Sequence, residues 1–207
     1  MSTIVVVKKA GRAVIAADTM TTSGSTKVPA KYVSNQSKIV NFDNSYIGSV
    51  GSAAHGNVLA NLIRRHPKKL SFQGVDEIFE TARKLHPLLK EEYFINTSEG
   101  SDDEDYESSQ MILLIANACG IFEVGSWRDV CEYERFWAIG SGRNYALGAM
   151  CAVYDKLETP EQIAEIGVSA GCEFDDGSGL PFTMHSVSLM VSVPRKPQRR
   201  RGSGKIP

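Results

Sequence analysis

The chain has 207 residues and a formal net charge of −1, with 42% hydrophobic and 23% charged residues. This length and hydrophobic content allow one sizeable core, so we expect a single domain. No run of about 18 apolar residues occurs, so we predict no membrane span. The four cysteines and four histidines are dispersed, which predicts reduced thiols, no metal site and no cofactor.

The amino-terminal stretch lacks the features of a secretory signal peptide. Its apolar run, residues 4–7, is too short, and charged residues follow this run instead of preceding it. We therefore expect a cytoplasmic protein.

Two blocks of opposite charge offset each other in the net charge. Residues 99–107 are acidic and contain no base, whereas residues 194–207 are rich in Lys and Arg. The acidic block predicts a solvated loop and the basic block a flexible tail, which leaves residues 1–193 as the domain. Because no aromatic residues are interleaved with the basic ones, we predict no nucleic-acid partner.

The start of the chain, residues 1–18, predicts a β-hairpin. Two β-branched runs flank a polar turn at residues 8–12 that contains Gly11. Ser2 lies near the start of the first strand, and Asp18 closes the second. Pairing of the two strands would bring the Asp18 carboxylate near the Ser2 hydroxyl.

Further strands are predicted from apolar runs between turn signals. Residues 19–35 are rich in Thr, Ser, Gly and Pro, which predicts a long irregular loop before the next strand. Asp43 and Asn44 then predict the turn of a second hairpin. A continuous apolar run at residues 111–116 is typical of a strand buried on both faces. The predicted strands after the first hairpin cover residues 38–42, 46–50, 111–116, 121–124, 136–139 and 182–193.

Four helices are predicted from apolar residues that recur with a helical period. Thr159 provides an N-cap for the fourth helix, followed by Pro160 at the first helical position and Gln162 as the partner in a capping box. The predicted helices cover residues 52–66, 75–89 with Pro87 as a potential kink, 143–153 and 160–168. This order of strands and helices predicts an α+β fold in which helix pairs cover both faces of a sheet sandwich.

Several short motifs resemble those of a known family. They are residues 2–5, 16–18, 38–40, 48–51 and 139–142. In order and spacing they resemble the β-type proteasome subunits, and most closely the bacterial members related to the HslV peptidase. Residues 35–38, 106–110 and 140–148 resemble the betaproteobacterial proteasome homologue in particular.

The resemblance implies a fold, an assembly and an activity. The implied fold is the four-layer αββα sandwich of the N-terminal-nucleophile hydrolases. The implied assembly is a homo-oligomeric double ring with its active sites inside, and six or seven subunits per ring remain open. The implied activity is endopeptidase cleavage of unfolded polypeptides, with an ATPase unfoldase as a candidate partner. The acidic residues 99–107 would then line a chamber or a pore mouth, as an alternative to a plain solvated loop.

The resemblance also implies roles for the residues of the two hairpins. Ser2 would be the nucleophile and its own amine the base, once Met1 is removed, because a hydroxyl attacks only when a base takes its proton. Lys38 would stabilise the deprotonated hydroxyl and favour the neutral amine, and Asp18 would orient that lysine. The Gly48 amide would donate to the oxyanion.

Residues later in the chain would support the terminal amine. By the same resemblance, Ser141 would bond the amine and help to transfer its proton, and Asp176 and Ser178 would lie near the nucleophile. Two alternatives stay open at this point. Lys31 is a rival for the role of Lys38, and residues 140–142 before a helix also fit a weak phosphate-binding turn.

One departure from the family pattern concerns the nucleophile. Threonine is usual there, whereas Ser2 lacks the methyl group that restricts the rotamers of threonine. Thr3 supplies a second hydroxyl, but it would become terminal only if Ser2 were lost as well. The alternatives to a peptidase are a small-molecule amidohydrolase with the same nucleophile and a catalytically silent cage or scaffold protein.

Overall fold

The first hairpin consists of β1 (Ile4–Lys9) and β2 (Arg12–Asp18), as predicted, in a computed structural model that describes residues 1–98 and 105–190. Its turn places Ala10 and Gly11 at φ of 50° and 73°. Positive φ at both central residues matches the right-handed twist of the flanking strands.

This hairpin forms the middle of a four-stranded antiparallel sheet in the order β10–β1–β2–β11. The edge strands are β10 (Phe136–Ile139) and β11 (Phe182–Ser188). Ile4 pairs with Ile139, and Asp18 pairs with Phe182. The segment after β10 and the segment before β11 therefore flank the amino terminus, although both are distant in sequence.

The second sheet has five antiparallel strands in the order β5–β6–β7–β8–β9. The predicted second hairpin forms its edge, with Asp43 and Asn44 at φ of 47° and 61°. The predicted apolar run forms the central strand β7. The strands are β5 (Ile39–Phe42), β6 (Ser45–Val50), β7 (Ile112–Asn117), β8 (Gly120–Val124) and β9 (Val130–Tyr133).

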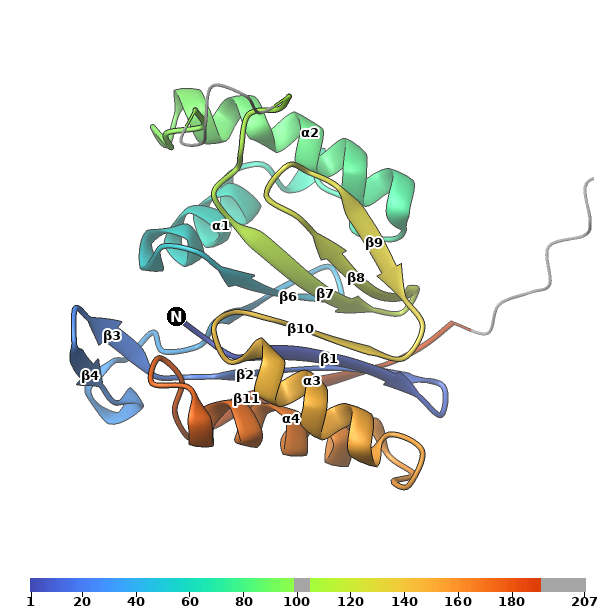
Figure 1. Cartoon of the computed structure of the whole chain (residues 1–207). Helices are drawn as coiled ribbons and strands as arrows, with labels where there is room; N and C mark the ends of the chain where they lie inside the picture. The colour runs from blue at the N-terminus through green and yellow to red at the C-terminus, as the bar shows by residue number, and fades with distance from the viewer. Residues whose placement is uncertain (99–104, 191–207) are drawn as a thin grey trace, which may run out of the picture.

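The two sheets pack face to face, and a pair of helices covers each outer side (Figure 1). In β1, Ile4 and Val6 face the second sheet, whereas Val5 and Val7 face the helices. A strand covered on both sides is apolar at every position, which explains the continuous hydrophobic run. The predicted four-layer αββα sandwich is confirmed.

The helices agree with the prediction except in length. The second sheet is covered by α1 (Ala53–Arg65) and α2 (Val75–Glu91), and the first by α3 (Arg143–Val153) and α4 (Pro160–Phe174). Helix α2 continues past Pro87. Helix α4 runs six residues beyond the predicted end at Val168, so Phe174 and not Val168 is its last residue. No helix in the described part of the chain has the length and apolar content to cross a membrane.

Three strand predictions were incomplete. The predicted loop at residues 19–35 contains a separate two-stranded sheet, β3 (Thr21–Ser23) and β4 (Thr26–Val28), which stands away from the main sandwich (Figure 1). It also contains a short 3-10 helix at Ala30–Tyr32. Strand β9 was not predicted. The last strand ends at Ser188, before the predicted residue 193.

The structure describes only a small part of the two charged blocks. Most of the acidic block and the whole basic tail lie outside the described residues. Within the described part, Glu107 lies 2.5 Å from Lys90 Nζ and 3.0 Å from His86 Nε2, both on α2. This end of the acidic block is therefore bound to a helix and is not simply solvated.

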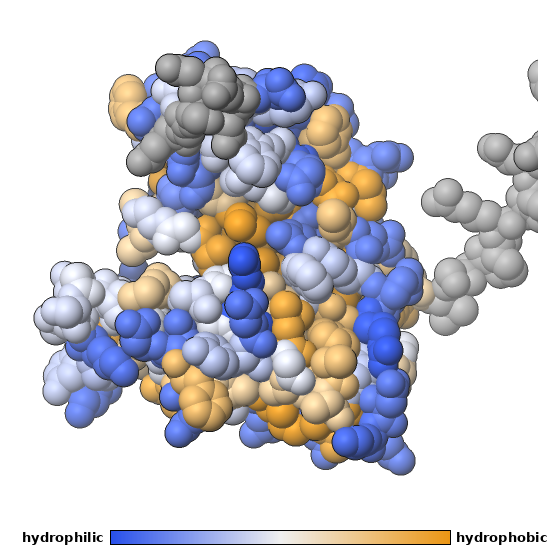
Figure 2. Space-filling view, viewed as in Figure 1, coloured by the Kyte–Doolittle hydropathy of each residue, from blue (hydrophilic) through white to orange (hydrophobic). Residues whose placement is uncertain are grey.

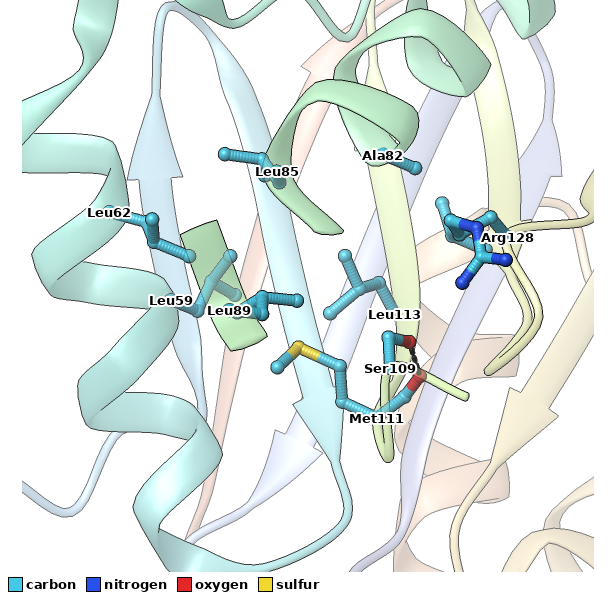
Figure 3. A pocket seen from close by; sticks show the side chains of 10 residues that line it. Leu59, Leu62, Ala82, Leu85, Leu89, Ser109, Met111, Leu113 and Arg128 are labelled. Carbon is cyan, nitrogen blue, oxygen red and sulfur yellow. Dashed lines mark hydrogen bonds between the residues drawn. The ribbon is translucent and has the colours of Figure 1, made fainter. Parts of the chain in front are cut away.

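A small cavity lies between α1, α2 and the second sheet. It has a volume of about 30 Å³ and is lined mainly by leucines, with Arg128 and Ser109 at one side (Figure 3). A space of this size holds about one water molecule. We therefore regard this cavity as imperfect packing and not as a ligand site.

Candidate active site

Ser2 lies two residues before the start of β1, at the edge of the sandwich where Figure 1 marks the amino terminus. The residue is 7% exposed. Its backbone nitrogen donates to Ser141 Oγ at 3.2 Å, and its own hydroxyl donates to the Met1 carbonyl at 2.5 Å. A Cβ at Gly140 would lie 2.1 Å from the Ser2 carbonyl oxygen. Glycine there allows the segment after β10 to approach Ser2 closely.

Asp18 and Lys38 form an ion pair beside this residue. Lys38 Nζ lies 2.8 Å from Asp18 Oδ1, and the two side chains are 14% and 0% exposed. The ammonium group also lies 3.4 Å from the Met1 carbonyl oxygen. The ion pair thus places a positive charge next to an acyl group attached to Ser2.

The Asp18 carboxylate is held by backbone amides as well as by lysine. Oδ1 accepts from the Thr3 amide at 2.9 Å, and Oδ2 accepts from the amides of Met20 at 3.2 Å and Gly179 at 3.1 Å. Hydrogen bonds of this kind stabilise an ionised carboxylate inside a protein. Asp18 is therefore a fixed anchor for Lys38.

Lys31, the rival lysine, lies elsewhere. It belongs to the short 3-10 helix, and its ammonium nitrogen lies 5.1 Å from the ring centroid of Tyr32. Of these two lysines, it is Lys38 that forms an ion pair with Asp18. The geometry favours Lys38 for the predicted role.

A second carboxylate approaches Ser2 from the opposite side, and it belongs to Asp175. Asp175 Oδ2 accepts from Ser141 Oγ at 2.8 Å and from Ser178 Oγ at 2.6 Å. Asp176, the aspartate predicted from the sequence, is exposed and makes no hydrogen bond within the described residues. Asp175 caps the carboxyl end of α4, so the helix end fixes which of the two adjacent aspartates faces Ser141.

Thr3 is a further residue whose contacts were not predicted. It is fully buried, and its Oγ1 lies 2.7 Å from Ser178 Oγ. The sequence offers one signal for these contacts, the Asp175-x-x-Ser178 spacing after α4. In the structure this spacing closes a turn in which the Ser178 amide donates to the Asp175 carbonyl at 3.2 Å.

Gly48 is the residue whose amide is predicted to donate to the oxyanion, and this role stays a prediction. It lies inside β6, where Ile39 and Leu114 are its partners on the two neighbouring strands. A Cβ at Gly48 would lie 2.9 Å from Ile4 Cγ2, so close packing of the two sheets accounts for this glycine.

Cys172 on α4 lies near both carboxylates. Its half-buried position raises the pKa of the thiol to about 12, and the nearby negative charge of Asp18 acts in the same direction. A neutral thiol is a poor nucleophile. Cys172 is therefore not an alternative nucleophile to Ser2.

The residues gathered here fit nucleophilic chemistry at a hydroxyl. Ser2 contributes the hydroxyl, Lys38 a positive charge, and Asp18 and Asp175 two anchoring carboxylates. Within residues 1–98 and 105–190, no group of three His, Cys, Asp or Glu side chains is arranged to hold a metal ion. Of the predicted residues, the structure brings Ser2, Asp18, Lys38, Ser141 and Ser178 together.

Comparisons with known proteins agree on one family. Residues 1–170 match the family model described as Proteasome subunit. The structure of Thiobacillus denitrificans BPH shares 40% identity at a TM-score of 0.86 and covers 92% of this chain and 100% of that one. The structure of Thiobacillus denitrificans BPH in complex with epoxomicin shares 40% identity at a TM-score of 0.85, covering 91% and 100%.

A more distant structure shares the fold. Eukaryotic HslV from Trypanosoma brucei is 22% identical at a TM-score of 0.64, covering 90% of this chain and 99% of that one. A search of curated proteins found no match.

Proposed function

Because the chain belongs to the proteasome subunit family, we propose that it is a peptidase whose nucleophile is the Ser2 hydroxyl after Met1 has been removed. The observation that carries this proposal is the convergence on Ser2 of the Asp18–Lys38 ion pair and the Ser141–Asp175 hydrogen bond. The complex that Thiobacillus denitrificans BPH forms with epoxomicin supports the same class of activity.

Removal of Met1 creates the base. The nitrogen that now forms a peptide bond and contacts Ser141 at 3.2 Å becomes a free amine. Ser141 donates its only proton to Asp175, so its oxygen accepts an N–H from Ser2. That contact orients the amine, whose lone pair is then available to take the proton of the Ser2 hydroxyl.

The reaction then follows from these positions. Ser2 Oγ bonds to the substrate carbonyl carbon while its proton moves to the amine. The peptide C–N bond breaks, and the leaving nitrogen takes that proton. The resulting ester is hydrolysed by water, with the same amine as the base. Lys38 stabilises the negative charge that develops, because its ammonium group already lies 3.4 Å from an acyl oxygen attached to Ser2.

The proposed substrates are unfolded polypeptides in the cytoplasm, and the proposed assembly is a double ring. Exposed hydrophobic residues support the assembly, because monomeric proteins rarely expose large apolar patches. Figure 2 shows hydrophobic residues across the middle of one face, between the helical layers. Large hydrophobic side chains that are exposed in the described part of the chain include Phe94, Trp127, Phe174 and Leu180. An ATPase unfoldase would supply such a chamber with unfolded chains.

Covalent labelling by epoxomicin tests the nucleophile. We expect the native protein to be labelled, and we expect Ser2→Ala and Lys38→Ala to abolish labelling. Lys31→Ala is the matched control and should be labelled like the native protein. Labelling of Ser2→Ala would refute the proposal.

Intact mass of the natively produced complex tests the processing step and the assembly together. Loss of one methionine and a mass of many subunits are expected. A retained Met1 would leave Ser2 without an amine, and the chain would then be a catalytically silent cage.

A further inference from the structure

Thr3, the residue after the proposed nucleophile, is hydrogen-bonded to Ser178, which in turn is hydrogen-bonded to Asp175. We propose that its hydroxyl is a positioning group for the reaction: it donates to Ser178 and thereby directs the Ser178 proton to Asp175. The inference rests on the proposed function of Ser2 and adds a residue to its support.

The Thr3 side chain is closely packed on all sides. The residue is fully buried, and its backbone is bound on both sides by Asp18, which accepts from the Thr3 amide at 2.9 Å and donates its own amide to the Thr3 carbonyl at 3.1 Å. A Cβ at Gly171 would lie 2.3 Å from Thr3 Oγ1 and 2.4 Å from Thr3 Cγ2. Packing against α4 therefore fixes the hydroxyl toward Ser178.

The donors in this network can be assigned from the carboxylate. An ionised carboxylate only accepts, and a serine hydroxyl has one proton to donate. Ser178 Oγ lies 2.6 Å from Asp175 Oδ2 and gives its proton there. Its contact with Thr3 Oγ1 at 2.7 Å must then be a bond that Thr3 donates.

The same reasoning applies to the other branch. Ser141 gives its proton to Asp175 Oδ2 at 2.8 Å, so it accepts from the Ser2 nitrogen at 3.2 Å. Two chains of hydrogen bonds, one from Ser2 and one from Thr3, thus end at the same oxygen, Asp175 Oδ2. Because Ser2 and Thr3 are joined by a peptide bond, the two chains form a closed ring of contacts. A change at Thr3 therefore reaches the Ser2 amine through Ser178, Asp175 and Ser141.

Loss of the Thr3 hydroxyl leaves Ser178 Oγ without its donor, in a residue that is 2% exposed. A buried hydroxyl with an unfilled acceptor site reorients or recruits water, and either response loosens Asp175. The Ser2 amine is then less well oriented to take a proton. Because Thr3 is fully buried, we expect its side chain not to touch the substrate, so the effect should appear in kcat and not in KM.

Two substitutions at Thr3 separate positioning from packing. Thr3→Val keeps the branched shape and removes the hydroxyl, and it should lower kcat for a fluorogenic peptide by about tenfold, the effect of about one hydrogen bond, with KM within about twofold. Thr3→Ser keeps the hydroxyl and loses the methyl group, and it should recover most of kcat while unfolding at a lower temperature. A purely structural role predicts that kcat follows the unfolding temperature in both variants, and this result would overturn the inference.

Thr183→Val is the matched control. Its Oγ1 is also buried but has no hydrogen-bond partner among the described residues, so the same change of side chain should leave kcat unchanged. If Thr3→Val does not assemble, Ser178→Ala removes the acceptor of the same bond and should lower kcat at constant KM. An unchanged kcat in Ser178→Ala would overturn the inference.

The outcomes for Thr3 and for Ser2 can be told apart. A native protein that neither hydrolyses peptide nor is labelled by epoxomicin contradicts the proposed function. An active native protein with an equally active Thr3→Val variant contradicts only the positioning role.

Discussion

Replacement of Asp18 by asparagine tests whether the Asp18–Lys38 pair holds the amino-terminal edge together. Asparagine has almost the same shape, but it has one acceptor oxygen in place of two and carries no charge. The native carboxylate accepts four hydrogen bonds, from Lys38 and from the amides of Thr3, Met20 and Gly179. In asparagine, an NH₂ group replaces one of the two oxygens and then faces N–H donors, to which it cannot form hydrogen bonds. Lys38 also loses the negative charge that balances its own.

The size of the effect follows from distance and burial. At 2.8 Å the direct attraction between the charges is ~6 kcal/mol with an effective dielectric constant of about 20. Desolvation of both groups offsets part of this value, and removal of one partner from a buried pair costs about 3–5 kcal/mol. Lys38 is 14% exposed, so we expect the lower end, about 3 kcal/mol.

Thermal unfolding at fixed protein concentration measures this loss. For a chain of this length, 1 kcal/mol corresponds to about 2–4 °C in Tm, so Asp18→Asn should lower Tm by about 6–12 °C. Asp155→Asn is the matched control, because Asp155 also pairs with a cation, Arg135, at 2.6 Å but its side chain is 81% exposed. An exposed pair contributes about 1 kcal/mol or less. Equal shifts in the two variants would refute the argument from burial.

Three further predictions concern stability. Thr183→Val removes a buried hydroxyl that has no partner among the described residues and should stabilise the fold by up to about 1 kcal/mol in chemical denaturation; a loss of stability would indicate an unseen partner. Val124→Ile adds one methylene beside the cavity of about 30 Å³ and should raise stability by about 0.8 kcal/mol, whereas a decrease would mean that the cavity is too narrow. Hydrogen bonds from Lys90 and His86 lower the pKa of Glu107 from 4.5 to about 2. A carboxyl group whose pKa is lowered by folding stabilises the fold at pH values above its pKa in the unfolded chain. The Tm difference between the native protein and Glu107→Gln should therefore be present at pH 7 and shrink as the pH falls below about 4.5. A difference that grows towards acid would contradict this assignment.

Local signals were sufficient for most of the fold. The turn residues Asn44 and Gly11 indicated two hairpins, because positive φ at these positions is a property of the residues themselves. The apolar run at residues 111–116 indicated a doubly covered strand, since both faces of that strand need hydrophobic residues. Helical periodicity and the Thr159 cap indicated the helices for the same local reason.

Strand pairing beyond local signals was missed. All four residues of strand β9 are exposed or half-buried, so the strand carries no hydrophobic pattern and exists because β8 offers a free edge. The β3–β4 pair was hidden by its Thr, Ser and Gly content, which is as typical of loops as of short exposed strands.

The sequence by itself determined which kinds of residue stand near the amino terminus and the order of the elements around them. Ser2 and Asp18 could be chosen because they lie at the ends of the first predicted hairpin, and Lys38 because its surroundings resemble a motif of the family. Only the tertiary structure decided that Asp175 and not its neighbour faces Ser141, and that sheet packing accounts for Gly48. The physical reason is that these choices depend on the end of a helix and on the register between strands far apart in sequence, and no local pattern encodes either one.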